Sequence, residues 1–196
     1  MNLKKGILLV LIAEALIAWL AIYHYGYTLE GLQATTRFSG RLSLAIFSAM
    51  FIFLPRNRDK LYSLLSSKPF HIFAIAHGIH LMQLLAFVYL SNADLIPIRL
   101  AGGFLAYVFI FIMPLLHIYS DTGKISAKQF GIAETIYLYY VWFIFFMSYL
   151  PRVQGKLPQV GGSYWEFIVL LSWVSILMGM KLSSLMVHRK RNDTED

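Results

Sequence analysis

Six long apolar segments follow one another along the chain, and this feature limits the possible folds more than any other. A helix needs about 20 predominantly apolar residues to cross the hydrocarbon core of a bilayer. The segments that reach or approach that length are residues 6–25, 38–54, 70–90, 98–119, 130–150 and 164–187. They show almost no amphipathic stripe, which is unusual for helices on a soluble domain. The sequence therefore predicts an all-α integral membrane protein, a single bundle of six transmembrane helices over residues 1–196.

The composition of the chain agrees with a membrane protein and excludes several other classes. Hydrophobic residues make up 58% of the chain and charged residues 14%, whereas a soluble domain averages about 45–50% and about 25%. There is no cysteine, which excludes disulfide scaffolds, cysteine-bound zinc and thiolate-held iron–sulfur clusters. The net charge is +7, but no loop is long enough to form an extramembrane domain that binds nucleic acid. The lipid bilayer is therefore an expected partner, and nucleic acid is not.

The distribution of basic residues predicts which way the helices run. If the N-terminus lies inside the cell, twelve of the 17 lysines and arginines fall on the inner side. The positive-inside rule then places both the N-terminus and the C-terminus in the cytoplasm. We expect the protein to lie in a bacterial inner membrane. The outer side would hold Arg37, Arg41, Arg99, Arg152 and Lys156.

Five ionisable residues are expected at membrane depth, where such residues are costly and are candidates for function. A rise of about 1.5 Å per residue predicts that Glu14, His77, His80, His117 and Glu134 all lie in the inner half of the bilayer. They come from four different segments, so a bundle can bring them together. This common depth makes them the main candidate site.

Two further features belong to the candidate site. His77 and His80 are three residues apart and share a helix face with Gln83, so this polar stripe should face the interior of the bundle. Arg37 and Arg41 are one turn apart at the outer end of the second segment. They are expected either to anchor that helix or to pair with an anionic group, such as a propionate or a lipid phosphate.

Three stretches of the sequence resemble the ferric reductase-like transmembrane domain. They are Arg37-Phe-Ser-Gly-Arg-Leu-Ser-Leu, Ala76-His77-Gly78-Ile79-His80-Leu81, and Tyr139-Tyr140-Val141-Trp142 followed by Ser148-Tyr149-Leu150. The resemblance covers about residues 35–152 and is strongest to small bacterial six-helix members that lack flavin and nicotinamide domains. It implies a bundle that binds haem b through histidines on facing helices and moves electrons across the membrane.

The resemblance also implies specific ligands for the haem iron. The ligand from the third segment would be His77 or His80. Family members usually carry a histidine near the start of the fifth helix, where this sequence has Glu134. A second histidine ligand would therefore have to be His117, or the iron would keep one weak or open position.

Three functions remain open at this stage, beside a weaker fourth, an iron or zinc site formed by His77, His80 and carboxylates. The first is a haem-b electron-transfer protein, a candidate oxidoreductase subunit. It would receive electrons from a quinol or a separate redox partner protein, because the chain has no dinucleotide-binding fingerprint. The second is a transporter or proton relay that uses Glu14, His77, His80 and Glu134 as a titratable chain. The third is a structural membrane protein without cofactor, whose polar residues only fix helix packing.

Overall fold

The computed structural model describes residues 1–55, 57–92, 97–157 and 161–192, with the backbone alone described at 97–100 and 184–192. Within these residues the chain forms seven helices and no strand. They are α1 (Leu3–Tyr25), α2 (Leu29–Phe53), α3 (Arg58–Leu64), α4 (Pro69–Ser91), α5 (Pro97–Asp121), α6 (Ala127–Val153) and α7 (Tyr164–Asn192).

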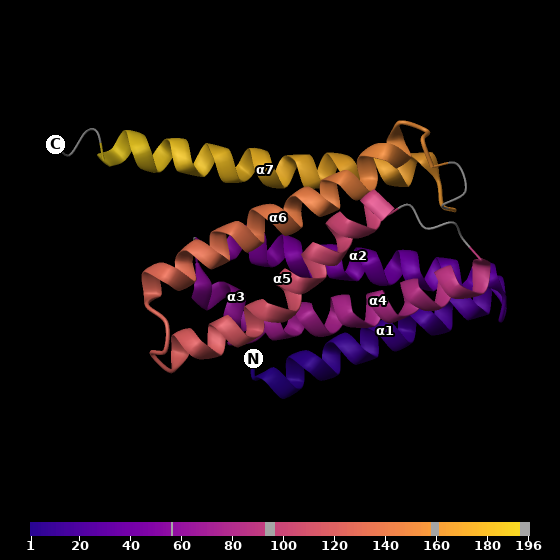
Figure 1. Ribbon diagram of the computed structural model, residues 1–196, viewed down its shortest axis with the longest axis horizontal. Coiled ribbons are helices and arrows are strands. Elements are labelled where there is room, and N and C mark those ends of the chain that lie inside the picture. Colours follow the sequence, from indigo (N-terminus) through magenta and orange to yellow (C-terminus); the bar gives the residue numbers. More distant parts are fainter. Residues whose placement is uncertain (56, 93–96, 158–160, 193–196) are drawn as a thin grey trace.

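The six longer helices run along the length of one bundle (Figure 1). The start of α1, the short helix α3, the connection between α5 and α6 and the C-terminal end of α7 lie at the same end of this bundle. The connections from α1 to α2 and from α6 to α7 lie at the opposite end. The chain therefore passes along the bundle repeatedly, as a multi-span membrane protein does.

Five of the described helices are long and apolar enough to cross a membrane: Leu3–Tyr25, Pro69–Ser91, Ala101–Asp121, Ala127–Val153 and Tyr164–Ser183. The structure is thus all-helical and compatible with a helical membrane protein. α2 is not among the five, so the sixth span stays a prediction.

α2 differs from the other long helices because it lies in the interior of the bundle. Twelve of its 25 residues are buried, compared with four of 23 in α1. Some of its buried hydroxyl groups are satisfied within the helix: Thr35 donates to the Gly31 carbonyl at 2.9 Å, and Ser48 donates to the Leu44 carbonyl at 2.7 Å. A helix surrounded by protein in this way can be more polar than a helix that faces lipid.

The ends of the helices follow local capping signals. α2 begins at Leu29, nine residues before the predicted start, because the Thr28 side chain accepts a hydrogen bond from the Gly31 amide and caps the helix. α6 begins with a capping box formed by Ser126 and Gln129. The short helix α3, capped by Asn57, was not predicted, since its seven residues show no apolar run.

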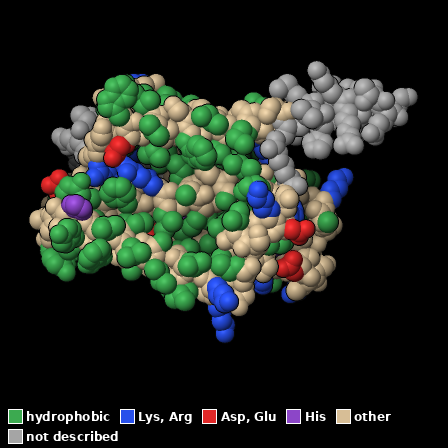
Figure 2. Space-filling view, turned by 180° about the vertical axis from the view of Figure 1, so that it is seen from behind, with side chains coloured by type: hydrophobic (Ala, Val, Ile, Leu, Met, Phe, Trp, Pro, Cys, Tyr) green, Lys and Arg blue, Asp and Glu red, His purple; other side chains and the backbone are tan. Residues whose placement is uncertain are grey.

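Apolar side chains cover much of the molecular surface. Figure 2 shows hydrophobic side chains over most of one face, with charged side chains mainly toward its two ends. On α1 the exposed side chains include Leu8, Leu9, Leu11, Ile12, Leu16 and Trp19. A soluble monomer rarely exposes so large an apolar area. The exposed helices therefore indicate contact with a lipid bilayer.

A cluster of aromatic rings holds the centre of the bundle together. Phe47 of α2 is fully buried, and its ring centroid lies 5.7 Å from that of Phe73 in α4 and 5.3 Å from that of Phe145 in α6. On the other side of α2, Trp173 of α7 donates a hydrogen bond to Ser48 at 2.9 Å. These contacts fix α2, α4, α6 and α7 around the region that contains the candidate site.

Candidate functional site

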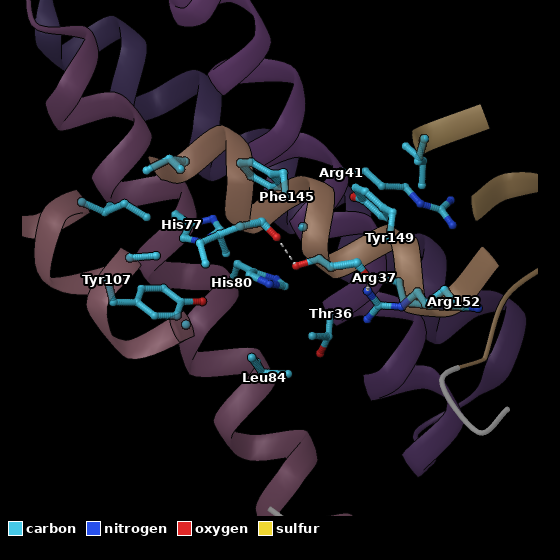
Figure 3. Close-up of a pocket in the computed structure, with 18 of the residues that line it drawn as sticks. Thr36, Arg37, Arg41, His77, His80, Leu84, Tyr107, Phe145, Tyr149 and Arg152 are labelled. Carbon is cyan, nitrogen blue, oxygen red and sulfur yellow. Dashed lines mark hydrogen bonds between the residues drawn. The ribbon is translucent and has the colours of Figure 1, made fainter. Parts of the chain in front are cut away.

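A cavity of about 260 Å³ lies inside the bundle, between α2 and α4 on one side and α5, α6 and α7 on the other. Two of the three histidines of α4, His77 and His80, line it. Three arginines, Arg37, Arg41 and Arg152, also belong to its lining. Figure 3 shows His77, His80 and Tyr107 at one end of the cavity, and Arg37 and Arg152 toward the other. The cavity therefore has an imidazole end and a guanidinium end.

The His77 ring is held between aromatic rings. It stacks on Phe73 and on Tyr107, with centroids 5.2 Å and 5.0 Å away, and Phe145 meets it edge-on at 5.8 Å. The His80 ring follows at 5.2 Å. Nδ1 of His77 is buried and has no hydrogen-bond partner among the described residues. The ring is thus fixed in orientation by packing, and its Nδ1 makes no hydrogen bond within the described part of the chain.

His80 lies against the backbone of α2. A Cβ atom on residue 40 would lie 3.0 Å from Cε1 of His80. Glycine at this position therefore lets the His80 ring pack against the backbone of α2 without a close contact. The His80 ring also interacts with the backbone of Thr36. His80 therefore has contacts with α2 that His77 lacks.

The close approach at Gly40 leads to a testable difference between two glycines. Alanine normally stabilises a helix interior by about 1 kcal/mol relative to glycine. We expect Gly131→Ala in α6, where no atom lies within 4 Å of the new Cβ, to raise the free energy of unfolding by up to this amount. Gly40→Ala should show no such gain, because the His80 ring must move. Denaturation of both purified variants in detergent measures the difference, and equal gains would contradict the contact.

The guanidinium end carries more positive than negative charge. Arg41 forms an ion pair with Glu166 of α7 at 2.7 Å. Arg152 donates to the backbone carbonyl of Ser148, one turn earlier in α6. Arg37 has two buried nitrogens, Nε and Nη1, without a hydrogen-bond partner in the described part of the chain. Arg152 was assigned only to the outer side by the sequence, since its place beside the cavity depends on how α6 packs.

Glu14 and Gln83 lie together, but outside the cavity lining. The Glu14 carboxylate is buried and accepts hydrogen bonds from Ser39 of α2 at 2.8 Å and from Gln83 of α4 at 3.2 Å. This cluster joins α1 to α2 and α4. Ser39 was not singled out from the sequence, because serine is common in helices and carries no signal of its own.

His117 and Glu134 lie in a third place, near α3. Glu134 accepts a hydrogen bond from Arg58 at 2.7 Å, and His117 lies 3.8 Å from Asp121 and packs against Phe130. Burial is the largest single effect and lowers the pKa of Arg58, but Glu134 and Tyr62 together raise it more, so the net pKa is above its ordinary value. Neither His117 nor Glu134 lines the cavity. The five residues expected at one depth are therefore distributed over three clusters.

The donor set of the cavity can be compared with what haem requires. A histidine pair on facing helices is not available, because among the described residues that line the cavity the histidines are His77 and His80, both on α4. The described residues also contain no group of three or more histidine, aspartate and glutamate side chains arranged to hold a metal ion. A haem in this cavity would therefore find its histidine on α4, at His77 or His80, whose Nδ1 atoms are both buried without a partner among the described residues.

Comparisons with known proteins add no family assignment. The sequence matches no protein-family model, and neither curated proteins nor solved structures match it significantly. The resemblance to the ferric reductase-like transmembrane domain therefore stays a prediction.

Proposed function

We propose that this membrane protein binds haem b in the cavity through a single axial histidine, His77, and acts in electron transfer. The observation that carries the proposal is the His77 ring, which is held between Phe73 and Tyr107 on the wall of an interior cavity with Nδ1 unpartnered. A histidine-ligated haem supplies one-electron redox chemistry when bound. His77 is favoured over His80 because His80 already contacts Gly40 and the Thr36 backbone.

The surrounding side chains have defined roles in this proposal. Phe73, Tyr107 and Phe145 orient the His77 imidazole and exclude water from it, which is how a protein environment tunes an iron ligand. If His77 alone held the haem, the bound group would be open to a small molecule in addition to electron transfer. The separate positions of Glu14 and Glu134 make a continuous titratable relay through these residues less favourable, so it is not proposed.

Electrons are proposed to come from a quinol or a partner protein. The sequence contains no dinucleotide-binding fingerprint and no βαβ unit. Efficient direct oxidation of NADH by the purified protein would therefore contradict this part of the proposal.

The absorption spectrum of protein purified from haem-replete cells tests the proposal. We expect a Soret band that moves on reduction with dithionite. Purified, folded protein without any Soret absorption, both as isolated and after incubation with added haem, would contradict it.

The proposed topology has six spans, including α2, with both termini in the cytoplasm of a bacterial cell. It is supported by the start of α1 and the end of α7, which lie at the same end of the bundle (Figure 1), and by the basic residues of the segments at that end, Lys4, Lys5, Lys60, Lys124 and Lys128. The positive-inside rule then assigns this side to the cytoplasm.

The absence of cysteine makes this topology easy to test. We expect Lys156→Cys, after α6, to react with a membrane-impermeant maleimide in intact cells. Asp59→Cys and Lys124→Cys should react only after permeabilisation. All three side chains are exposed, so a buried position cannot explain a lack of labelling. Labelling of Lys124→Cys in intact cells would reverse the orientation, and labelling of all three from one side would contradict the six spans.

A further inference from the structure

The guanidinium end of the cavity contains positive charge that the described residues do not neutralise. Arg37, Arg41 and Arg152 line the cavity, and no aspartate or glutamate belongs to its described lining. Glu166 pairs with Arg41 at 2.7 Å and also interacts electrostatically with Arg37. Glu166 thus offsets one of the three guanidinium charges, which leaves an excess of two positive charges among the described residues at this end.

Arg37 is the most strongly constrained of the three. Its Nε and Nη1 atoms are buried without a hydrogen-bond partner among the described residues. The backbone of Gly161 and Gly162 covers it: a Cβ on Gly162 would lie only 2.5 Å from Nη1. Burying a charged donor without a partner is costly, because the group loses its hydration and gains nothing in return. An anion that reached these two nitrogens would remove that cost.

Arg152 is held in position by contacts that leave its charge uncompensated. It donates to the Ser148 backbone carbonyl, and its guanidinium lies 5.7 Å from the centroid of Phe167 and 6.0 Å from that of Tyr149. In Figure 3, Arg37 and Arg152 lie at the same end of the cavity, whereas the Arg41 side chain extends elsewhere. The planar fork of arginine suits two-point binding of a carboxylate or a phosphate.

We infer that Arg37 and Arg152 form an anion-binding site for the carboxylate or phosphate group of an amphiphile whose apolar body fills the cavity toward His77. The cavity lining supports an apolar body, because it also includes Ile110, Val141, Ile144 and Leu170. Two sources offer this chemistry in a membrane. One is a propionate of haem, which rests on the proposed function, and the other is the phosphate of an anionic phospholipid, which does not.

The first arm of the test compares haem with haem dimethyl ester, in which both propionates are neutral. Each is titrated into haem-free protein in phosphatidylcholine nanodiscs. We expect Arg37→Gln and Arg152→Gln each to weaken haem binding by about 10-fold or more and to leave binding of the ester unchanged. The ester serves as an internal control for folding, because a misfolded variant would lose both ligands. Lys156→Gln removes a nearby exposed charge outside the cavity and should change neither affinity.

The second arm measures retention of phosphatidylglycerol by native mass spectrometry, without haem. If the phospholipid is the natural ligand, the wild type retains it, Arg37→Gln and Arg152→Gln lose it, and Lys156→Gln keeps it. If neither the wild type nor any variant binds haem, the proposed function is contradicted. The anion site is still supported in that case if Arg37→Gln and Arg152→Gln lose phosphatidylglycerol. The inference is overturned if the two arginine variants neither distinguish haem from its ester nor lose phosphatidylglycerol.

Discussion

Replacing His77 by alanine is expected to yield folded protein that has lost its Soret band. The imidazole of His77 is the one that aromatic rings fix on the cavity wall, and the chain has no cysteine that could ligate the iron instead. His80→Ala should weaken haem binding and leave the Soret band visible, because His80 lies beside His77 but is not the proposed ligand. Absorption spectra of the purified variants, normalised to protein, measure this directly.

Two further variants serve as controls for the His77 result. His24 is exposed at the end of α1, so His24→Ala should keep the full Soret band. Glu134→His introduces a histidine that lies beside Arg58 and away from the cavity lining, so it should not restore haem to the His77→Ala protein. An unchanged Soret band in His77→Ala, or its restoration by Glu134→His, would contradict the assignment of the ligand.

Replacing Phe47 by alanine is expected to cause the largest loss of stability. The Phe47 ring is fully buried and contacts Phe51, Phe73 and Phe145, so that its removal opens a void between α2, α4 and α6. Comparable changes in soluble cores cost about 3–5 kcal/mol. Since the loss in a membrane protein comes from packing and not from contact with water, we expect a value near the lower end, about 3 kcal/mol.

A matched phenylalanine provides the control for this measurement. Phe104 of α5 is 70% exposed, so Phe104→Ala should change the free energy of unfolding by less than about 0.5 kcal/mol. Equilibrium unfolding of both variants in mixed micelles gives the comparison. Equal effects of the two substitutions would show that Phe47 has no special role in the core.

Much of the helical organisation could be predicted from apolar run length alone. Residues 70–90 were predicted as a span and form α4 over Pro69–Ser91. The same criterion placed the start of α2 at residue 38 and missed residues 29–37, because Glu30, Gln33 and Arg37 interrupt any apolar run there. It also missed α3, whose seven residues lie outside the apolar runs.

The candidate site could be predicted only where a single helix determines it. The spacing of His77 and His80 predicts a shared face, and their rings lie 5.2 Å apart. Depth along the membrane does not determine how each helix is rotated about its axis. Glu14 therefore meets Ser39 and Gln83, and Glu134 meets Arg58, instead of joining the histidines. Tyr107 and Arg152 enter the cavity through the packing of α5 and α6, for which the sequence contains no local signal.

The most direct test of the central claim is the electron paramagnetic resonance spectrum of the oxidised, purified wild-type protein at neutral pH. A haem held by His77 alone leaves the other axial position without a strong protein ligand, so the account predicts a high-spin ferric signal. A low-spin signal typical of two histidine ligands, or the absence of any haem signal, would contradict it.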